Sequence, residues 1–382
     1  MKCVLADIAD VTMGQSPKSE YYNSEKNGMP FLQGNRTFGK KYPTFDTYTT
    51  FITKTAKSGD VIMSVRAPVG DVNITPIDMC LGRGVCGIRM KNENQEFLFY
   101  LLKYYMPRLV NKQSGTVFGS VNKNDINSLE IDIPEDSTIQ RKIARYLSMI
   151  DEKIELNEKI NKNLEQQAEA IFQSSIGNAI STVNLGEIAD VKGGKRLPKG
   201  INLIDIPNTH PYIRVRDLNN ALFASLTPDY AYVDEETQKS ISRYIVSTGD
   251  VLISIVGTIG LTAIVDSTLD KANLTENCVK VANLKHITPE YLLLYLRSQL
   301  GREAIAKGTV GAVQQKLPIK NIQAIPIPLL IEKDKNTLFC TLDSIFAEIS
   351  SNVIQSAKLA SLRDTLLPKL MSGELDVSNI DL

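Results

Sequence analysis

The 382-residue chain is poor in the side chains on which most catalytic sites are built. It has two histidines, His210 and His286, for which we expect surface or loop positions. No GxSxG, HExxH or complete P-loop motif occurs, nor the (Asn/Asp)-Pro-Pro-aromatic tetrad of an amino-methyltransferase. A chain of this size without a convergent set of acids and bases is expected to bind rather than to catalyse.

Cysteine, net charge and long apolar runs are also scarce. The five cysteines form neither a CxxC pair nor a Cys/His cluster, so we expect no disulfide framework and no zinc site. The formal net charge is zero, and any affinity for DNA must therefore come from local clusters. No apolar run reaches membrane-spanning length, and MKCVLADIAD has no signal-peptide core, which predicts a cytoplasmic protein.

Two short motifs resemble functional sites but favour structural roles. Gly82-x-Gly84-x-x-Gly87 matches the dinucleotide fingerprint, yet Ile88 and the residues after it continue as a strand where a helix is required. We therefore expect a glycine-rich strand or bulge. Asp60 and Asp250 recur in equivalent positions, but each follows glycine, which is typical of tight turns rather than of a metal pair.

One long segment, 139–172, contains no proline or glycine and has apolar residues at alternating spacings of four and three. This is the pattern of a coiled-coil seam. The seam positions are Ile143, Leu147, Ile150, Ile154, Asn157, Asn161, Leu164, Ala168 and Ile171. Adding 195 gives a second seam: Leu338, Leu342, Ile345, Ile349, Asn352, Ser356, Leu359, Arg363 and Leu366. We predict two long helices of one design, although two unrelated amphipathic helices would also fit. Asn157 and Asn352 either set the register inside the seam or lie on its solvated shoulder.

The segments before the two helices repeat each other. LADIADV at 5–11 matches LGEIADV at 185–191, and each is followed by a Gly-Asp-Val strand, an apolar helix and a polar loop. In the first copy we expect a short amphipathic element, strands at 61–65 and near VNI, one strand over CLGRGVCGIRM, and a helix ending at or soon after Pro107. The whole chain is therefore a duplicated unit of globular domain plus long helix, with pseudo-two-fold symmetry.

Basic and amide side chains recur in the loops of both copies. Arg and Lys suit phosphates and guanine edges, and Gln suits adenine. We predict DNA contacts for Lys18, Arg36, Lys40, Lys41, Arg66, Arg83, Lys112, Gln113, Ser114 and Lys123 in the first copy, and for Lys195, Arg196, Lys199, Arg214, Arg216, Arg243, Lys307, Gln314, Gln315 and Lys316 in the second. The alternative is that these charges are ordinary solvated loops.

Several motifs together resemble a known family. They are LGEIADVKGGKRL, the GDVLIS strand with its following GTIG, LTEN at 274–277, YLLLYLRS, GTVGAVQQKLPIKNIQAIPIPL and LLPKLMSGEL. In this order, and with the duplication, they resemble the specificity subunit of type I restriction-modification enzymes. The resemblance covers nearly the whole chain.

The resemblance implies a fold and a role. The fold is mixed α/β: target recognition domains at 1–136 and 179–331, a central spacer helix at 137–178, a distal spacer helix at 332–372 packed antiparallel to it, and a tail at 373–382 that we expect to be loose. Each domain would read one half of a split double-stranded DNA site. Because their loops differ, the half-sites should differ.

The resemblance also implies partners. The spacer helices would dock two methyltransferase subunits, which restriction (translocase-nuclease) subunits would join. S-adenosylmethionine, ATP and Mg²⁺ would belong to those partners, and no cofactor to this chain. Two alternatives remain: a structural coiled-coil adaptor whose domains bind protein, and a stand-alone restriction-modification enzyme, for which the sequence has no motifs.

Overall fold

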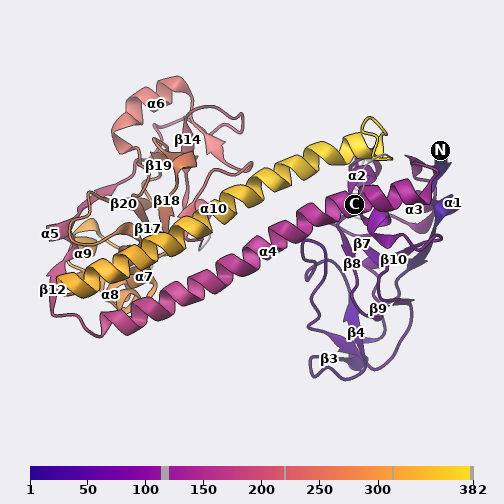
Figure 1. Cartoon of the computed structure of the whole chain (residues 1–382), viewed down its shortest axis with the longest axis horizontal. Coiled ribbons are helices and arrows are strands. Elements are labelled where there is room, and N and C mark those ends of the chain that lie inside the picture. Colours follow the sequence, from indigo (N-terminus) through magenta and orange to yellow (C-terminus); the bar gives the residue numbers. More distant parts are fainter. Residues whose placement is uncertain (113–119, 219–220, 312–313, 379–382) are drawn as a thin grey trace. The chain divides into compact units, whose positions relative to one another are not determined.

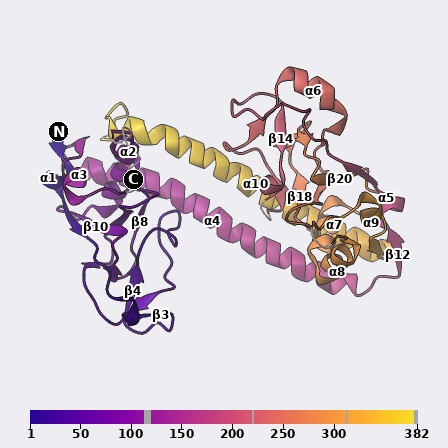
Figure 2. The same ribbon diagram turned by 180° about the vertical axis from the view of Figure 1, so that it is seen from behind.

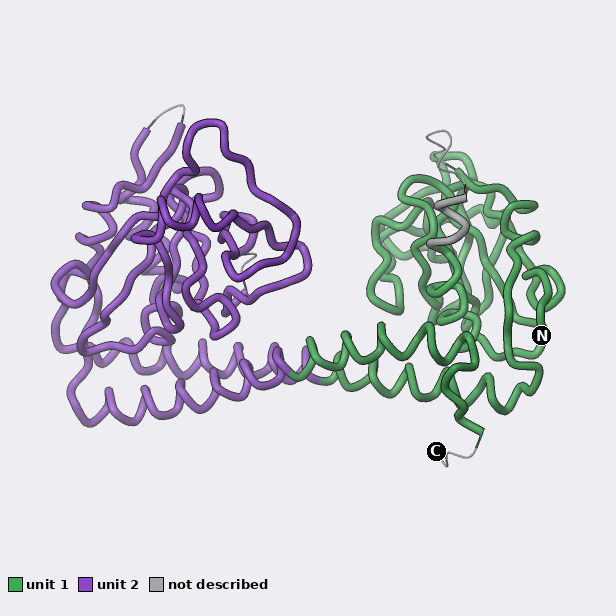
Figure 3. Tube along the Cα trace, turned by 90° about the horizontal axis from the view of Figure 1, so that it is seen from above, with its two compact units in different colours: residues 1–156, 355–382 green, residues 157–354 purple. Residues whose placement is uncertain are grey.

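The computed structural model describes residues 1–112, 120–218, 221–311 and 314–378. The chain divides into two compact units (Figure 3): residues 1–156 with 355–382 form unit 1, and residues 157–354 form unit 2. Each unit contains one globular region and part of each of two long helices.

Unit 1 is built on a four-stranded antiparallel sheet with the order β2-β10-β7-β8. Its strands are β2 (Ala9–Met13), β10 (Val85–Met90), β7 (Val61–Ser64) and β8 (Val72–Ile74). Helix α2 (Gln95–Lys112) packs against this sheet with Phe97 and Leu101 fully buried. Asn94 begins the helix by accepting a hydrogen bond from the Phe97 amide.

A second, smaller sheet of unit 1 has the order β3-β5-β4-β9-β6. These strands are β3 (Tyr22–Asn23), β5 (Tyr48–Thr49), β4 (Met29–Leu32), β9 (Met79–Leu81) and β6 (Thr55–Ala56). The N-terminal strand β1 (Lys2–Val4) pairs with β11 (Glu130–Asp132), the last strand before the long helix. The short helices are α1 (Leu5–Ile8), η1 (Ser19–Tyr21) and α3 (Lys123–Asn127).

Unit 2 repeats this plan with additions. Its main sheet has the order β13-β20-β17-β18-β15, in which β15 is an extra strand parallel to β18. The strands are β13 (Asp190–Gly193), β20 (Cys278–Ala282), β17 (Val251–Ser254), β18 (Thr262–Val265) and β15 (Phe223–Ala224). A small sheet combines β16 (Ala231–Tyr232), β14 (Pro211–Ile213) and β19 (Asn273–Leu274), and β12 (Ser181–Asn184) pairs with β21 (Pro326–Leu329). The helices are α5 (Leu185–Ile188), η2 (Val215–Leu218), α6 (Glu235–Ile241), η3 (Ser242–Tyr244), η4 (Ser267–Leu269), α7 (Pro289–Arg297), α8 (Gln299–Gly308) and α9 (Ile319–Gln323).

Equivalent hydrogen bonds confirm the duplication predicted from the sequence. The Lys91 amide donates to Ile8 O at 2.8 Å, and in unit 2 the Lys285 amide donates to Ile188 O at 2.7 Å. Thr288 caps α7 as Asn94 caps α2, which aligns the two helices with an offset of 194. The cap of this helix and the hydrogen bond that joins the end of the strand to the short first helix are thus shared by both copies.

The two long helices are α4 (Ser137–Ile176) and α10 (Glu332–Met371), each of 40 residues. They lie side by side and antiparallel in both units (Figures 1 and 2), since α4 residues 151 and 161 contact α10 residues 363 and 352. All eighteen predicted seam positions are buried or half-buried. Asn157 is 0 % exposed and Asn352 is also buried, so both lie inside the helix pair and not on its shoulder.

Helices α2 and α10 both continue past a proline, and α10 ends within one residue of the predicted 372. Helix α2 continues beyond Pro107 to Lys112, and α10 continues through Pro368 to Met371. A proline removes one backbone donor and can bend a helix, but the turns on either side keep their own hydrogen bonds. Gly373 follows the end of α10 with φ +75, the left-handed conformation typical of a helix C-terminus.

Three segments contain more structure than their polar or glycine-rich sequences suggested. CLGRGVCGIRM forms two strands, β9 and β10, because Gly82–Gly84 turns the chain between two sheets. The loop before β11 contains α3, which begins with a capping box in which Asn122 and Asp125 exchange side-chain and backbone hydrogen bonds. In unit 2, Ser298 divides the expected single helix into α7 and α8 by capping the second.

The C-terminal segment is not a loose tail as far as the structure describes it. Val377 is 4 % exposed and belongs to the apolar core of unit 1. Lys142 Nζ on α4 donates to Ser378 O at 2.7 Å. An isolated apolar side chain in a polar stretch can therefore dock a terminus on the core, because burying it removes apolar surface from water.

Candidate DNA interface

In unit 1, three loops interlock at one place where strands end. The Gly14 amide donates to Val85 O at 3.0 Å and the Gln15 amide to Leu81 O at 2.8 Å, so the segment after β2 crosses the turn between β9 and β10. The amide of Arg83 in that turn donates to Ser16 Oγ at 3.0 Å. A Cβ on Gly14 would come within 3.0 Å of two carbonyl oxygens, so only glycine fits this crossing.

The segment after β4 closes the same crossing from another side. The Gly84 amide donates to Gln33 O at 2.9 Å, and the Val65 amide donates to Gly84 O at 2.9 Å. Here too a Cβ on Gly84 would meet a backbone oxygen within 3.0 Å. We call this arrangement the unit 1 crossing. It brings together the side chains of Gln15, Ser16, Gln33, Arg66 and Arg83, which come from four different segments and are exposed except for the half-buried Ser16.

Unit 2 contains the same crossing. The Gly194 amide donates to Cys278 O at 3.0 Å, the Lys195 amide donates to Leu274 O at 2.8 Å, and a Cβ on Gly194 would again meet a carbonyl oxygen within 3.0 Å. The Thr275 amide donates to Ile213 O at 3.1 Å and closes the crossing from the β14 side. The unit 2 crossing presents, in the corresponding positions, Lys195, Arg196, Arg214, Val256 and Glu276.

The two crossings differ sharply in charge arrangement. In unit 2, Arg196 Nε donates to Glu276 Oε1 at 2.7 Å. Burial of Glu276 acts to raise its pKa, but the hydrogen bonds from Arg196, from the backbone and from Thr275, together with the Arg196 charge, outweigh this and hold the pKa of the carboxyl below its usual value. Lys195 Nζ lies 5.5 Å from the centre of the Tyr244 ring. Arg214 binds Asp217 through two guanidinium nitrogens, at 2.9 and 3.0 Å. These contacts fix the directions of three cationic side chains.

The predicted residues of unit 1 fall into distinct surroundings. Arg66 and Arg83 belong to the crossing, and Lys18, Lys40 and Lys123 are exposed. Arg36 is exposed but paired with Asp46 at 2.7 Å. Lys41 is half-buried, with its ammonium 2.6 Å from Glu96, so it already has a structural partner. The side chain of Lys112 and the whole of Gln113 and Ser114 lie outside the described residues.

More of the predicted residues of unit 2 belong to its crossing or border it. Lys195, Arg196 and Arg214 belong to the crossing, and Lys199, Arg216 and Arg243 are exposed. Lys307 lies near the end of α8. The loop with Gln314, Gln315 and Lys316 borders the crossing, because Lys316 forms a β-bridge with Val256 and the Leu317 amide donates to Ile255 O at 2.9 Å. Both glutamines are exposed there.

Sequence reasoning missed four polar residues of the two crossings: Gln15, Ser16, Gln33 and Glu276. None of the four is basic, so a search for cationic loops does not find them. The signal that could have found them is positional. Gly14 and Gly194 are repeat equivalents, and each is followed by two polar residues, Gln15-Ser16 and Lys195-Arg196.

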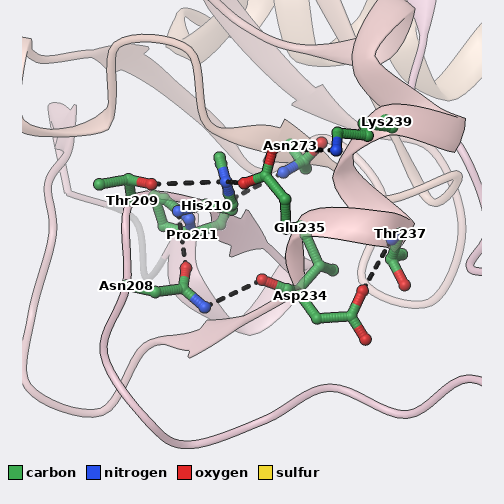
Figure 4. A network of polar contacts seen from close by, with 10 residues as sticks. Asn208, Thr209, His210, Pro211, Asp234, Glu235, Thr237, Lys239 and Asn273 are labelled. Atoms are coloured by element: carbon green, nitrogen blue, oxygen red, sulfur yellow. Dashed lines mark hydrogen bonds and ion pairs between the residues drawn. The ribbon is translucent and has the colours of Figure 1, made fainter.

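His210 lies in a polar network that supports the small sheet of unit 2 (Figure 4). Its Nε2 is 2.7 Å from Glu235 Oε2, and its amide donates to Asn208 Oδ1 at 2.7 Å. Asp234 accepts from the Thr237 amide and begins α6. The hydrogen bond with His210 lowers the pKa of Glu235. These contacts tie α6 to the strand β14 that leads into Arg214, which is a structural role.

The described residues contain neither a metal-binding cluster nor a membrane-spanning helix. None of the clusters of His, Cys, Asp and Glu within the described ranges could hold a metal ion. None of the described helices is long and apolar enough to cross a membrane. Asp60 and Asp250 each accept a backbone amide in a turn, from Lys57 and Ser247, and each pairs with a cation, Arg89 and Lys280.

The sequence profile of the family described as "Type I restriction modification DNA specificity domain" matches residues 1–166 and 179–359. The chain belongs to this family. It is 41 % identical over 164 residues to a putative type I restriction enzyme MjaX specificity subunit of Methanocaldococcus jannaschii, a match covering 42 % of this chain and only 38 % of that relative. It is 24 % identical to the HindI specificity subunit of Haemophilus influenzae, over 84 % of this chain and 88 % of the relative.

A solved structure of another protein has the same fold as this chain. It is the type I restriction-modification S subunit from M. genitalium, with a TM-score of 0.62, 17 % identity, and coverage of 99 % of this chain and 96 % of that one. The mixed α/β fold with two similar domains and two packed long helices is thereby confirmed.

Proposed function

We propose that the chain is the DNA-specificity subunit of a type I restriction-modification complex and has no catalytic activity of its own. Each crossing, with the loops around it, reads one half of a bipartite double-stranded DNA target. One observation supports this most directly: the same glycine-locked crossing occurs in both units but presents different polar side chains. A rigid backbone frame with variable donors and acceptors suits the reading of base edges.

The differences between the crossings support two unlike half-sites. Unit 1 presents amides and a hydroxyl together with Arg66 and Arg83, whereas unit 2 presents Lys195 and an Arg196–Glu276 pair. An arginine fits the two acceptors of guanine, a glutamine fits the donor–acceptor pair of adenine, and a glutamate accepts from cytosine. The target is therefore asymmetric.

The long helices suit a spacer. A 40-residue helix is about 60 Å long at 1.5 Å per residue, and one turn of DNA is about 34 Å. Exposed apolar residues on the helices, among them Met149, Leu156 (50 % exposed) and Leu362, offer docking points for methyltransferase subunits. Restriction subunits would join that core. S-adenosylmethionine, ATP and Mg²⁺ belong to these partners, and a complex that acts on DNA in this way would work in the cytoplasm.

Footprinting of the chain together with its methyltransferase partner tests the bipartite reading. We expect two protected patches separated by an unprotected gap. Substitutions of Gln314 and Gln315, which border the unit 2 crossing, should change base preference in one patch only. One continuous short footprint would refute the bipartite target. Absence of any salt-dependent DNA affinity would favour instead a coiled-coil adaptor whose domains bind protein.

A length change tests the spacer. Deleting four residues, about one helical turn, from within 150–160 should change the preferred gap or abolish binding. The preferred bases of each half-site should stay the same, because both crossings are intact. The matched experiment deletes four facing residues from each helix, 155–158 of α4 and 355–358 of α10, so that the contacts on either side, Asp151–Arg363 and Asn161–Asn352, keep their register. An unchanged gap preference in both variants would show that the helices do not set the gap.

A further inference from the structure

A buried polar triad joins the globular region of unit 1 to both of its long helices. Tyr100 on α2 donates its hydroxyl to Asp151 Oδ2 on α4 at 2.7 Å. Arg363 Nη1 on α10 donates to the other carboxylate oxygen, Asp151 Oδ1, also at 2.7 Å. The Tyr100 ring is fully buried, and the side chains of Asp151 and Arg363 are only 15 % and 24 % exposed. The carboxylate at the centre is therefore held from both sides.

Each member of the triad depends on the others. Burial and the neighbouring Asp151 raise the pKa of Tyr100, which keeps its hydroxyl protonated as a donor. Burial acts to lower the pKa of Arg363, but its hydrogen bonds to Asp151 and Asp364 outweigh this and raise it. A charged group this far from water is tolerated only with its partner, since removing one partner leaves an uncompensated charge. Lys103 and Lys41 lie near the same carboxylate, and Glu96 lies near Tyr100.

The equivalent positions in unit 2 are all apolar. The offset of 194 between α2 and α7 relates Tyr100 to Leu294. The offset of 195 between the long helices relates Asp151 to Phe346, and Arg363 to Ala168. Leu294, Phe346 and Ala168 are all buried and belong to one core cluster. At equivalent positions, unit 1 therefore has a charged, hydrogen-bonded triad and unit 2 has an apolar set. A residue from one set does not fit with the residues of the other.

This incompatibility matters because every three-way contact combines two halves of the chain. In unit 1, Tyr100 and Asp151 come from residues 1–178, and Arg363 comes from residues 179–382. In unit 2, Leu294 and Phe346 come from 179–382, and Ala168 comes from 1–178. We call these two segments the first and second half-chains. Because the fold is pseudo-symmetric, two first half-chains could in principle pair with each other, and so could two second ones.

Such like-with-like pairing would mix the two sets. Two first half-chains would place Ala168 where Arg363 belongs and leave the Asp151 carboxylate buried without its cation. Two second half-chains would place Arg363 against Phe346 and Leu294, where no acceptor replaces Asp151. Both wrong pairings are penalised, and the correct pairing is not. This is the pattern expected where specificity requires rejection of an alternative partner.

We propose that Tyr100, Asp151 and Arg363, together with Leu294, Phe346 and Ala168, form a pairing key that makes the first half-chain accept only the second half-chain as its partner. A pair of identical half-chains would carry the same recognition domain twice. If the proposed function holds, the key therefore ensures that each assembled protein carries two different recognition domains, one for each half-site. The key itself is tested without DNA, so it and the proposed function can fail independently.

Single substitutions in the full-length chain reproduce each wrong combination. Arg363→Ala gives unit 1 the contents of a pair of first half-chains, and Ala168→Arg gives unit 2 those of a pair of second half-chains. We expect each to lower the folding equilibrium constant of its unit, by about 10- to 100-fold for Arg363→Ala and about 100-fold for Ala168→Arg. Urea unfolding followed by proteolysis, which reports each unit separately, measures the loss.

The decisive variants exchange a whole set. Tyr100→Leu with Asp151→Phe and Arg363→Ala gives unit 1 the unit 2 set, and we expect most of the loss from Arg363→Ala to be regained. Asp151→Asn with Arg363→Gln is an isosteric second variant, which should also regain stability because no charge remains unpaired. Ala170→Arg, at an exposed position of α4, is the matched control for Ala168→Arg and should change little. Equal stability of wild type, Arg363→Ala and Ala168→Arg would overturn the key, and so would failure of both compensated variants to exceed Arg363→Ala.

Discussion

Asn352 Nδ2 on α10 donates a hydrogen bond to Asn161 Oδ1 on α4 at 2.9 Å, and both side chains are buried between the helices. Two weaker contacts surround it: Asn157 Nδ2 lies 3.5 Å from Asn352 O, and Asn161 Nδ2 lies 3.4 Å from Ile349 O. Buried amides in an otherwise apolar seam cost stability but penalise any shifted register, in which they would lose their partners.

Removing this contact should destabilise the helix pair. For Asn352→Ala we expect a loss of about 1–3 kcal/mol, because Asn161 Oδ1 stays buried and loses its donor. Chemical denaturation of the full chain measures the loss. Asn163→Ala, an exposed asparagine on α4, is the control and should change stability by less than about 0.5 kcal/mol. A loss of similar size in both variants would show that the amide pair has no special role.

The glycines of the crossings should tolerate no side chain. Gly14→Ala and Gly194→Ala each force a Cβ against backbone oxygens, so we expect a loss of about 1–3 kcal/mol and weaker binding to one half-site. Gly34→Ala is the control within the same region, because nothing lies within 4 Å of its Cβ position. Thermal unfolding and DNA titration together check this prediction. If Gly34→Ala were as harmful as Gly14→Ala, the steric explanation would be wrong.

The Arg196–Glu276 pair should make stability depend on pH. The folded-state pKa of Glu276 lies below the ordinary 4.5. The stabilisation is therefore fully present above about 4.5 and is lost as the pH falls through the depressed folded value. The difference in urea midpoint between wild type and Arg196→Ala should shrink on going from neutral pH to that range. Arg243→Ala, an exposed arginine, should show no such change. A constant difference would mean that the pair does not contribute.

Base contacts and phosphate contacts in unit 2 should separate experimentally. Replacing Gln314 and Gln315, which border the crossing, should relax base preference at the second half-site only. Replacing Lys195 and Arg196 should weaken binding to all sequences and reduce the salt slope by about one per lost phosphate contact. Binding to a panel of target variants at several salt concentrations measures both. The same uniform loss in both variants would contradict this division.

The duplication and the two long helices could be predicted because they depend on periodicity. The seam from Ile143 to Ile171 repeats with one offset, and burial follows that repeat throughout. The positions of helix caps and of the C-terminal segment were harder to predict from the sequence. Asn122 and Asp125 spell a capping box inside a polar loop, and Ser298 ends one helix by beginning another. Val377 docks on the core although its neighbours are polar, because the slot it fills is made by residues far away in the sequence.

The crossings themselves could be predicted only in part. Arginines such as Arg66, Arg83 and Arg196 stand out by charge, and the structure does place them together with other polar groups. Gln15, Gln33 and Glu276 come close to them only because glycines let backbone segments pass within hydrogen-bonding distance. Such three-segment contacts have no local sequence pattern. The half-buried pairing of Lys41 with Glu96 likewise depends on tertiary packing.

Both crossings are held by amide–carbonyl bonds and by the absence of a side chain at Gly14 and Gly194. Apart from Ser16, whose hydroxyl accepts the Arg83 amide, the side chains displayed in unit 1 contribute little to keeping the loops in place. Point changes at Gln15, Gln33 or Arg83 can therefore accumulate without rebuilding the sheets below. A lineage could acquire a new half-site this way while retaining its glycines, its helices and its partners. Natural variation should concentrate at the displayed positions and spare the glycines beside them.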